Sequence, residues 1–169
     1  MKENLPKRKD LRLKEYDYNG AGLYFITICT QNRRKILSNI VGGDVLDAPC
    51  VDLTEYGRIA EKYIKQLDNH YENISVEQYV VMPNHIHLIL FVYQDGSSRT
   101  STPTAKQHSV VPAFVSTLKR FCNKEIGENI WQRGFYDHII RDKRDYEEIS
   151  KYILENPLKW QFDELYCTE

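Results

Sequence analysis

Continuous runs of apolar residues along the chain predict four strands. Residues 23–30 (Leu-Tyr-Phe-Ile-Thr-Ile-Cys-Thr) are rich in β-branched and aromatic side chains, as buried strands are. Residues 74–82 and 85–92 predict two more strands, separated by the turn pair Pro83-Asn84. Residues 135–141 predict the fourth strand.

Three other segments carry apolar residues at the spacing of an amphipathic helix. Thr54 is a predicted N-cap, and apolar residues recur on one helical face behind it. Residues 110–126 predict a second helix. Asp142 is a predicted cap of a third helix, which runs to about Asn156 and is stopped by Pro157.

The predicted order is strand, helix, strand, strand, helix, strand, followed by an additional C-terminal helix. This order indicates an α+β fold, the ferredoxin-like split βαβ arrangement with an antiparallel sheet. Polar segments predict a loop over residues 41–49 and a long flexible loop over residues 94–108. The chain of 169 residues has no internal repeat, so we expect a single domain over residues 1–169. Such a fold hosts many functions and leaves the activity open.

Composition is typical of a soluble globular protein. Hydrophobic residues make up 41% of the chain, and no apolar run approaches the roughly 20 residues that span a bilayer. The charged N-terminus has no apolar stretch behind it, so we expect no secretory signal and no membrane partner. The four cysteines are scattered without a Cys-x-x-Cys pair, which indicates reduced thiols and a cytoplasmic protein.

The net charge of −1 gives no overall support to nucleic-acid binding, but the basic residues are unevenly spread. One group forms a basic N-terminal arm over residues 1–14, and a second runs from residue 119 to residue 144. Such patches can neutralise phosphates, although ordinary solvated surface is the alternative. The residues that we expect to contact DNA are Lys7, Arg8, Lys9, Arg12, Lys119, Arg120, Arg133 and Arg141.

Two histidines begin the third predicted strand. Successive strand residues point to opposite faces, so His85 and His87 share one face and Ile86 points to the other. Two neutral imidazoles about 7 Å apart along a strand can bind one divalent ion from the same side. A hydrogen-bonded structural role is the alternative. His138 on the fourth strand is a candidate third ligand or substrate contact, again with a structural role as the alternative.

The last predicted helix carries a tyrosine and an asparagine that face the same way. Tyr152 and Asn156 are four residues apart, beside the apolar stripe of Tyr146, Ile149 and Ile153. A phenol and a carboxamide could therefore reach one site, where the amide oxygen completes a metal shell begun by the histidines. In the alternative interpretation Tyr152 only packs and Asn156 only ends the helix.

Together, these two segments resemble a known family. His-Ile-His on a strand and Tyr-x-x-x-Asn on a late helix resemble the His-hydrophobic-His single-tyrosine (IS200-like) transposases, and most of all their REP-associated tyrosine branch. The likeness extends over residues 12–160, with Met-Pro-Asn before the histidines as its most specific feature. The segments that carry it are residues 12–18, 24–32, 81–88, 131–133 and 152–157.

The resemblance implies a metal-dependent endonuclease and strand transferase that acts on single-stranded DNA with REP-like hairpins. It implies Mg or Mn held by His85, His87 and Asn156, with Tyr152 as the nucleophile. Tyr152 would join a DNA 5′ phosphate and free a 3′ hydroxyl. Insertion-sequence relatives carry Gln where Asn156 stands, which favours the REP-associated branch. A phenol with a pKa near 10 is a poor nucleophile at neutral pH, and an adjacent cation favours the phenolate.

Three other functions fit parts of the same pattern. A hairpin-binding regulator without cleavage would use the fold and the basic arm and leave the site residues idle. A metal-dependent phosphohydrolase for a small molecule would need a closed pocket and no covalent intermediate. A replication initiator or relaxase would share the chemistry. We expect a monomer or a homodimer.

Overall fold

The computed structural model describes residues 20–42, 50–93 and 110–166. The basic arm at residues 1–14 and the loop predicted at residues 94–108 lie outside the described residues. The strands of the main sheet are β1 (Gly22–Cys29), β4 (Ile74–Val81), β5 (His85–Val92) and β6 (Tyr136–Ile140). The helices are α1 (Glu55–His70), α2 (Val110–Ile126) and α3 (Lys143–Glu155). Smaller elements are β2 (Ser38–Val41), β3 (Cys50–Leu53) and the 3₁₀ turns η1 (Gln31–Arg33) and η3 (Trp160–Phe162).

The main sheet has the strand order β4-β5-β1-β6, and every neighbouring pair is antiparallel. The two central strands, β5 and β1, come from different halves of the chain, as the split βαβ arrangement requires. The predicted α+β class, the antiparallel sheet and the additional C-terminal helix are thereby confirmed. All four sheet strands lie within two residues of their predicted bounds.

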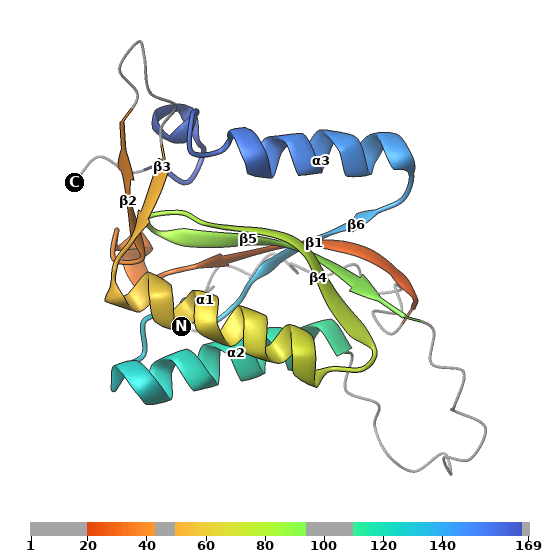
Figure 1. Ribbon diagram of the computed structural model, residues 1–169, viewed down its shortest axis with the longest axis horizontal. Coiled ribbons are helices and arrows are strands. Elements are labelled where there is room, and N and C mark those ends of the chain that lie inside the picture. The colour runs from red at the N-terminus through yellow and green to blue at the C-terminus, as the bar shows by residue number, and fades with distance from the viewer. Residues whose placement is uncertain (1–19, 43–49, 94–109, 167–169) are drawn as a thin grey trace, which may run out of the picture.

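Helices cover both faces of this sheet (Figure 1). α1 and α2 lie side by side on one face, and α3 lies on the other. Alternate residues of β1 serve the two faces: Tyr24 and Ile26 belong to the larger core under α1 and α2, whereas Phe25 belongs to a smaller core under α3. The other buried members of the smaller core are Ile89, Ile140 and Ile153.

Local sequence signals explain where the helices begin. The Thr54 hydroxyl accepts a hydrogen bond from the Gly57 amide at 3.2 Å, and the Asp142 carboxylate accepts one from the Asp145 amide at 2.9 Å. Gly57 has a further role, because a Cβ there would lie 2.0 Å from the Leu37 carbonyl oxygen. The first turn of α1 therefore approaches the backbone at a distance that only glycine permits.

The prediction of a loop over residues 41–49 is wrong at its start, because Val41 belongs to β2. β2 pairs with β3 from Ser38 opposite Leu53 to Val41 opposite Cys50. Each of these strands has four residues, in which exposed positions alternate with buried or half-buried ones, and each contains polar residues. An alternation this short does not predict a strand from the sequence. Residues 43–49 lie outside the described residues.

Within the described part of the chain, no helix combines the length and the apolarity that crossing a membrane requires.

Candidate active site

The two histidines begin β5 on the sheet face that α3 covers. His85 pairs with Cys29 and His87 pairs with Thr27 of β1, so both imidazoles lie on the two central strands, at one end of the sheet. Their exposed fractions are 0% and 2%. The predicted shared face is what brings the two rings together, with the Nε2 atoms 2.9 Å apart.

Hydrogen bonds behind the rings orient both imidazoles. His85 Nδ1 lies 2.7 Å from Asn84 Oδ1, which must accept because the Asn84 Nδ2 group donates to the Leu165 carbonyl at 2.8 Å. His87 Nδ1 lies 2.9 Å from the Thr27 hydroxyl, which can also accept. With both Nδ1 atoms donating, the two Nε2 lone pairs point toward one place. Adjacent ligands about 2.1 Å from one ion lie about 3 Å apart, so this spacing fits a bound cation.

Burial also sets the protonation of the pair. Removal from solvent lowers the pKa of His85 to about 4 and lowers the pKa of His87 well below its ordinary value. The second, smaller cause at His87 is the neighbouring His85. Both rings are therefore neutral at physiological pH, which is the form that binds metal ions.

α3 brings Tyr152 to the histidines. The buried Ile153 anchors the helix against the sheet. The hydroxyl of the preceding residue, Tyr152, lies 3.3 Å from His87 Nε2. Phe25 stacks on His87 at a centroid distance of 5.0 Å and contacts the Tyr152 ring edge-on at 6.2 Å. Tyr152 remains 41% exposed, so its hydroxyl combines contact with the buried pair and access from solvent.

Asn156, four residues later, is 2% exposed. Its Nδ2 group donates to Asp163 Oδ2 at 2.7 Å, while its Oδ1 atom is buried without a hydrogen-bond partner among the described residues. An unpartnered buried carbonyl oxygen loses its solvation with nothing in return. It is a suitable donor atom for a cation, so the residues present fit the divalent ion that the sequence implies.

Asp163 is the site residue that the sequence analysis missed. It follows η3, and its Oδ2 atom accepts hydrogen bonds from the Tyr152 hydroxyl at 2.8 Å and from Asn156. The ligand atoms of His85, His87 and Asp163 lie within 4.8 Å of one another and form a possible metal-binding group. The segment after Pro157 has no periodic pattern, and one acidic residue gave no signal in the sequence.

The carboxylate also affects the phenol. Burial, and then the hydrogen bond and negative charge of Asp163, raise the pKa of Tyr152. The hydroxyl is therefore protonated in the metal-free protein, and its proton already faces an acceptor. A positive charge at the histidines would act in the opposite direction and favour the phenolate.

An open groove of about 580 Å³ runs along this site. Tyr152 and Asp163 line it together with Thr27, Cys29 and Tyr136. Tyr136, at the start of β6, is 53% exposed and is a second phenol within the same groove. The cysteines in the described part of the chain, Cys29, Cys50 and Cys122, are free thiols, as expected.

The four predicted DNA-contacting residues that the structure describes do not form one patch. The Lys119 ammonium donates to the Gln132 and Gly134 carbonyls, so it supports a loop, and burial lowers its pKa to about 8. Arg133 is exposed beside that loop, whereas Arg141 lies past the opposite end of β6. The Arg120 guanidinium lies over the Phe121 ring. Lys7, Arg8, Lys9 and Arg12 lie outside the described residues.

His138 lies apart from the histidine pair. Its Nε2 atom contacts Asp145 Oδ2 at 3.0 Å, at the start of α3. This contact corresponds to the structural role left open for it, and no contact links it to His85 or His87 among the described residues.

Comparisons with known proteins place the chain in a family. An uncharacterized protein of Haemophilus influenzae (strain ATCC 51907 / DSM 11121 / KW20 / Rd) is 29% identical and covers 94% of this chain and 93% of its own length. The REP-associated tyrosine transposase of Escherichia coli (strain K12) is 27% identical over 84% of this chain and 70% of its own. A solved REP-associated tyrosine transposase bound to a REP hairpin shares the fold, with a TM-score of 0.62, 21% identity, and coverage of 90% of this chain and 77% of that chain. The model of the family described as "Transposase IS200 like" matches residues 21–156. This match spans most of the chain and confirms the resemblance: the protein belongs to the IS200-like transposase family.

Proposed function

We propose that this chain cleaves and rejoins single-stranded DNA, with Tyr152 as the nucleophile and Mg or Mn as the cofactor. The observation that carries the proposal is the position of the Tyr152 hydroxyl beside a buried pair of neutral imidazoles. This hydroxyl lies 3.3 Å from His87 Nε2. Packing of the Tyr152 ring alone would not require its hydroxyl to lie beside two converging lone pairs. Membership of a transposase family supports the same activity.

His85, His87 and the Oδ1 atom of Asn156 would hold the ion, with Asp163 beside them. When bound, the ion supplies positive charge that favours the phenolate and neutralises the attacked phosphate. All three proposed ligands are neutral, so the charge that offsets the ion's own comes from the neighbouring Asp163 carboxylate. Asn84 and Thr27 fix the two rings in the ligating tautomer through their contacts with Nδ1.

The protein's own residues account for the proton. The Tyr152 hydroxyl donates to Asp163 Oδ2 at 2.8 Å, so this carboxylate receives the proton as the phenol oxygen attacks phosphorus. The tyrosine–phosphate bond forms, the bond from phosphorus to the 3′ oxygen breaks, and the freed 3′ oxygen takes up one proton from solvent, to which Asp163 returns the proton that it received. The 5′-phosphotyrosine link conserves the bond for joining, when a 3′ hydroxyl attacks it in reverse.

The partner that we propose is single-stranded DNA carrying a REP-like hairpin, because a relative of the same fold is described as bound to a REP hairpin. The open groove beside Tyr152 would admit an unpaired strand rather than a small enclosed substrate. The basic arm, through Lys7, Arg8 and Lys9, would add phosphate contacts. A single domain would suffice for this activity, as a monomer or a homodimer.

The test uses the full chain and hairpin oligonucleotides with unpaired flanks, incubated with Mn or Mg or with EDTA. A denaturing gel detects a covalent protein–DNA adduct, and peptide mapping identifies the linked residue. We expect an adduct on Tyr152 with metal and none with EDTA. Tyr152→Phe should bind the hairpin without forming an adduct, whereas the matched variant Tyr136→Phe should still form one.

Each alternative gives a distinct result. An adduct on Tyr136 would overturn the assignment of the nucleophile and with it the role of Asn156. Hairpin binding without any adduct would indicate a regulator. Full cleavage by a His85→Ala, His87→Ala double variant would refute the metal site, because these substitutions remove both imidazole ligands. A replication initiator or relaxase would form the adduct and differ only in its DNA target.

A further inference from the structure

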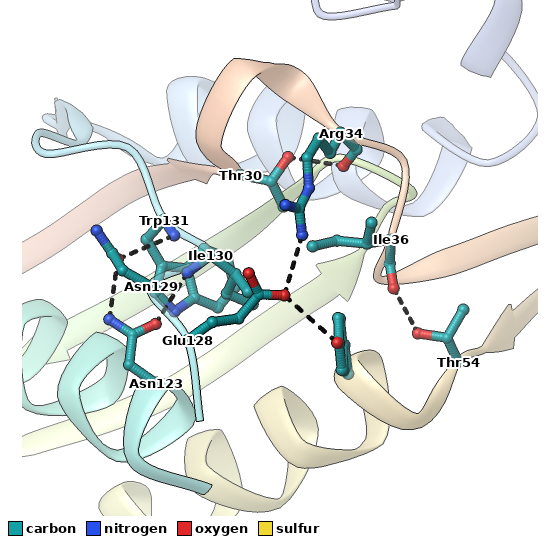
Figure 2. Close-up of polar contacts among 10 residues, drawn as sticks. Thr30, Arg34, Ile36, Thr54, Asn123, Glu128, Asn129, Ile130 and Trp131 are labelled. Atoms are coloured by element: carbon teal, nitrogen blue, oxygen red, sulfur yellow. Dashed lines mark hydrogen bonds and ion pairs between the residues drawn. The ribbon is translucent and has the colours of Figure 1, made fainter. Parts of the chain in front are cut away.

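Charged side chains outside the catalytic groove differ in whether their charges are paired. One cluster connects the residues after η1 with α1 and with the loop before β6 (Figure 2). In this cluster the Arg34 guanidinium pairs with the Glu128 carboxylate at 3.3 Å, and the Tyr56 hydroxyl donates to the same carboxylate at 3.4 Å. The Asn123 and Asn129 carboxamides are hydrogen-bonded to each other at 3.0 Å. The polar groups of this cluster satisfy one another, which indicates a structural role.

Glu77, on the edge strand β4, has no such partner. It is the extra residue of a β-bulge, because its neighbours Val76 and Gln78 pair with consecutive residues of β5. Glu77 is exposed, and its carboxylate accepts a hydrogen bond from the Ser75 hydroxyl at 2.5 Å. Among the residues that the structure describes, no cation pairs with this carboxylate. A negative charge held in a fixed place is therefore available for a ligand.

An open pocket of about 340 Å³, here named the aromatic pocket, lies beside this carboxylate. Its lining consists of Glu77, one leucine and three aromatic side chains: Leu23, Phe91, Tyr93 and Tyr146. Leu23 and Phe91 are paired residues of β1 and β5 on the sheet face that α3 covers, and Tyr146 comes from the first turn of α3. The Phe91 and Tyr93 rings lie 4.8 Å apart with an angle of 88° between their planes, so they form two perpendicular walls.

Core packing does not account for two of these rings. Within the described part of the chain, Phe91 and Tyr93 belong to neither of the two cores, and Tyr93 is 47% exposed. The Tyr93 hydroxyl donates to the Ser75 hydroxyl at 3.2 Å, and Ser75 in turn donates to Glu77. This chain of hydrogen bonds connects the ring to the carboxylate, so the aromatic pocket keeps its shape without a ligand.

The aromatic pocket is separate from the catalytic groove but shares a helix with it. His87 and Phe91 lie on the same face of β5, four residues or about 13 Å apart along the strand. On α3, Tyr146 and Tyr152 are six residues or about 9 Å apart along the helix axis. The same helix therefore contributes the proposed nucleophile to the groove and one wall to the aromatic pocket.

We propose that the aromatic pocket binds an alkylammonium group of a small molecule, either a quaternary ammonium such as choline or a primary ammonium of a polyamine. The face of an aromatic ring carries partial negative charge, and several rings around an ammonium group are a general mode of recognition. Glu77 adds a full negative charge, which would repel a phosphate or carboxylate ligand. A neutral ligand would leave that charge unpaired. The proposal does not depend on the proposed function, because the aromatic pocket and the groove have no lining residue in common.

A ligand in this position would affect α3. It would contact Tyr146 of the helix together with Phe91 of the sheet, so it would bind only while α3 is docked. By mass action, a ligand at ten times its dissociation constant lowers the population with α3 detached about 11-fold. Since α3 also carries Tyr152, the bound cation would hold the proposed nucleophile beside the histidines.

The test measures binding of three probes to the full chain by NMR titration of its aromatic side-chain signals. Choline carries a quaternary ammonium, 3,3-dimethylbutan-1-ol is its neutral counterpart of the same shape, and putrescine carries primary ammonium groups. We expect choline to bind about 2- to 30-fold more tightly than the neutral alcohol, because only the cation interacts with the ring faces and with the carboxylate. The ratio of the choline and putrescine affinities shows which kind of ammonium the aromatic pocket prefers.

Three substitutions remove single parts of the aromatic pocket. Phe91→Leu and Tyr93→Leu replace a ring by an aliphatic side chain, and Glu77→Gln removes the charge at nearly constant size. Each should bring the choline affinity closer to that of the neutral alcohol. The matched controls, Phe162→Leu on η3 and Glu72→Gln after α1, change an exposed ring and an exposed carboxylate elsewhere and should keep the wild-type affinity. Circular dichroism and thermal unfolding check that each variant is folded, and Tyr93 and Glu77 are exposed, so their substitution leaves both cores intact.

Hydrogen exchange provides a second measurement. Saturating choline should slow the exchange of α3 backbone amides in the wild type, and this slowing should be lost in the Tyr93→Leu variant.

Other outcomes overturn the proposal. Equal affinities for choline and the neutral alcohol would show that the charge is not recognised. Choline binding that survives all three substitutions would place the cation elsewhere, and absence of binding by both choline and putrescine would leave the aromatic pocket without its ligand class. Unchanged exchange of α3 in the presence of bound choline would refute the position between the helix and the sheet.

Discussion

Acidification of the metal-free protein should destabilise it through the buried histidine pair. In the unfolded chain the His85 imidazole has a pKa near 6.5, whereas burial in the folded protein lowers this pKa to about 4. The unfolded state therefore gains a proton as the pH falls through 6.5, and the folded state gains it only near pH 4. At pH 5 this difference removes about 2 kcal/mol from the free energy of unfolding. The lowered pKa of His87 acts in the same direction.

Urea denaturation in EDTA at pH 8 and pH 5 measures the effect. With a slope of about 2 kcal/mol per molar urea, His85 accounts for a fall of about 1 M in the midpoint. His85→Gln should therefore reduce the difference between the two midpoints by that amount. The control is His70→Gln, at the exposed end of α1, which should keep the wild-type difference. Equal midpoint differences for wild type and His85→Gln would refute the role given to burial of this imidazole.

Three further substitutions or deletions test other parts of the structure. Thr27→Val removes the hydroxyl that meets His87 Nδ1 at 2.9 Å and keeps the side-chain shape; we expect metal affinity, measured by calorimetry, to fall about 10- to 100-fold, and an unchanged affinity would show that the contact does not orient the ring. Gly57→Ala places a methyl group 2.0 Å from the Leu37 carbonyl oxygen; it should lower the free energy of unfolding by about 1–3 kcal/mol, and wild-type stability in urea would contradict this packing. Deletion of residues 1–9 removes Lys7, Arg8 and Lys9; the slope of log affinity for single-stranded DNA against log salt should fall by about 2, and an unchanged slope would place the arm away from the DNA.

Most of the fold follows from local patterns, because those patterns concern neighbours in the sequence. The alternation that puts His85 and His87 on one face is a property of any strand, so their convergence was predictable. Tyr152 and Asn156 are likewise related by one helical turn. The predicted caps Thr54 and Asp142 are confirmed. They could be predicted because each hydrogen bond joins residues only three positions apart.

The parts that were not predicted depend on contacts between distant segments. Asp163 reaches the site only because the chain turns back after α3 through η3. The sequence of this segment has no periodic pattern that would predict the turn. β2 and β3 are too short for a readable alternation and are defined by pairing with each other. The role of Lys119 was obscured for the same reason, since its charge is visible in the sequence and its two carbonyl partners are not.

The unequal cores on the two sides of the sheet set different opening energies for the two halves of the site. α3 contributes one buried residue, Ile153, with Tyr146 and Ile149 packed partly against the sheet. At about 1.5–3 kcal/mol for a fully buried side chain and less for the others, this burial amounts to roughly 4 kcal/mol. Detachment of α3 alone would then occur in about one molecule in a thousand. Each such event carries Tyr152 away while His85 and His87 stay within the intact sheet, so backbone amides of α3 should exchange with deuterated solvent sooner than those of β5.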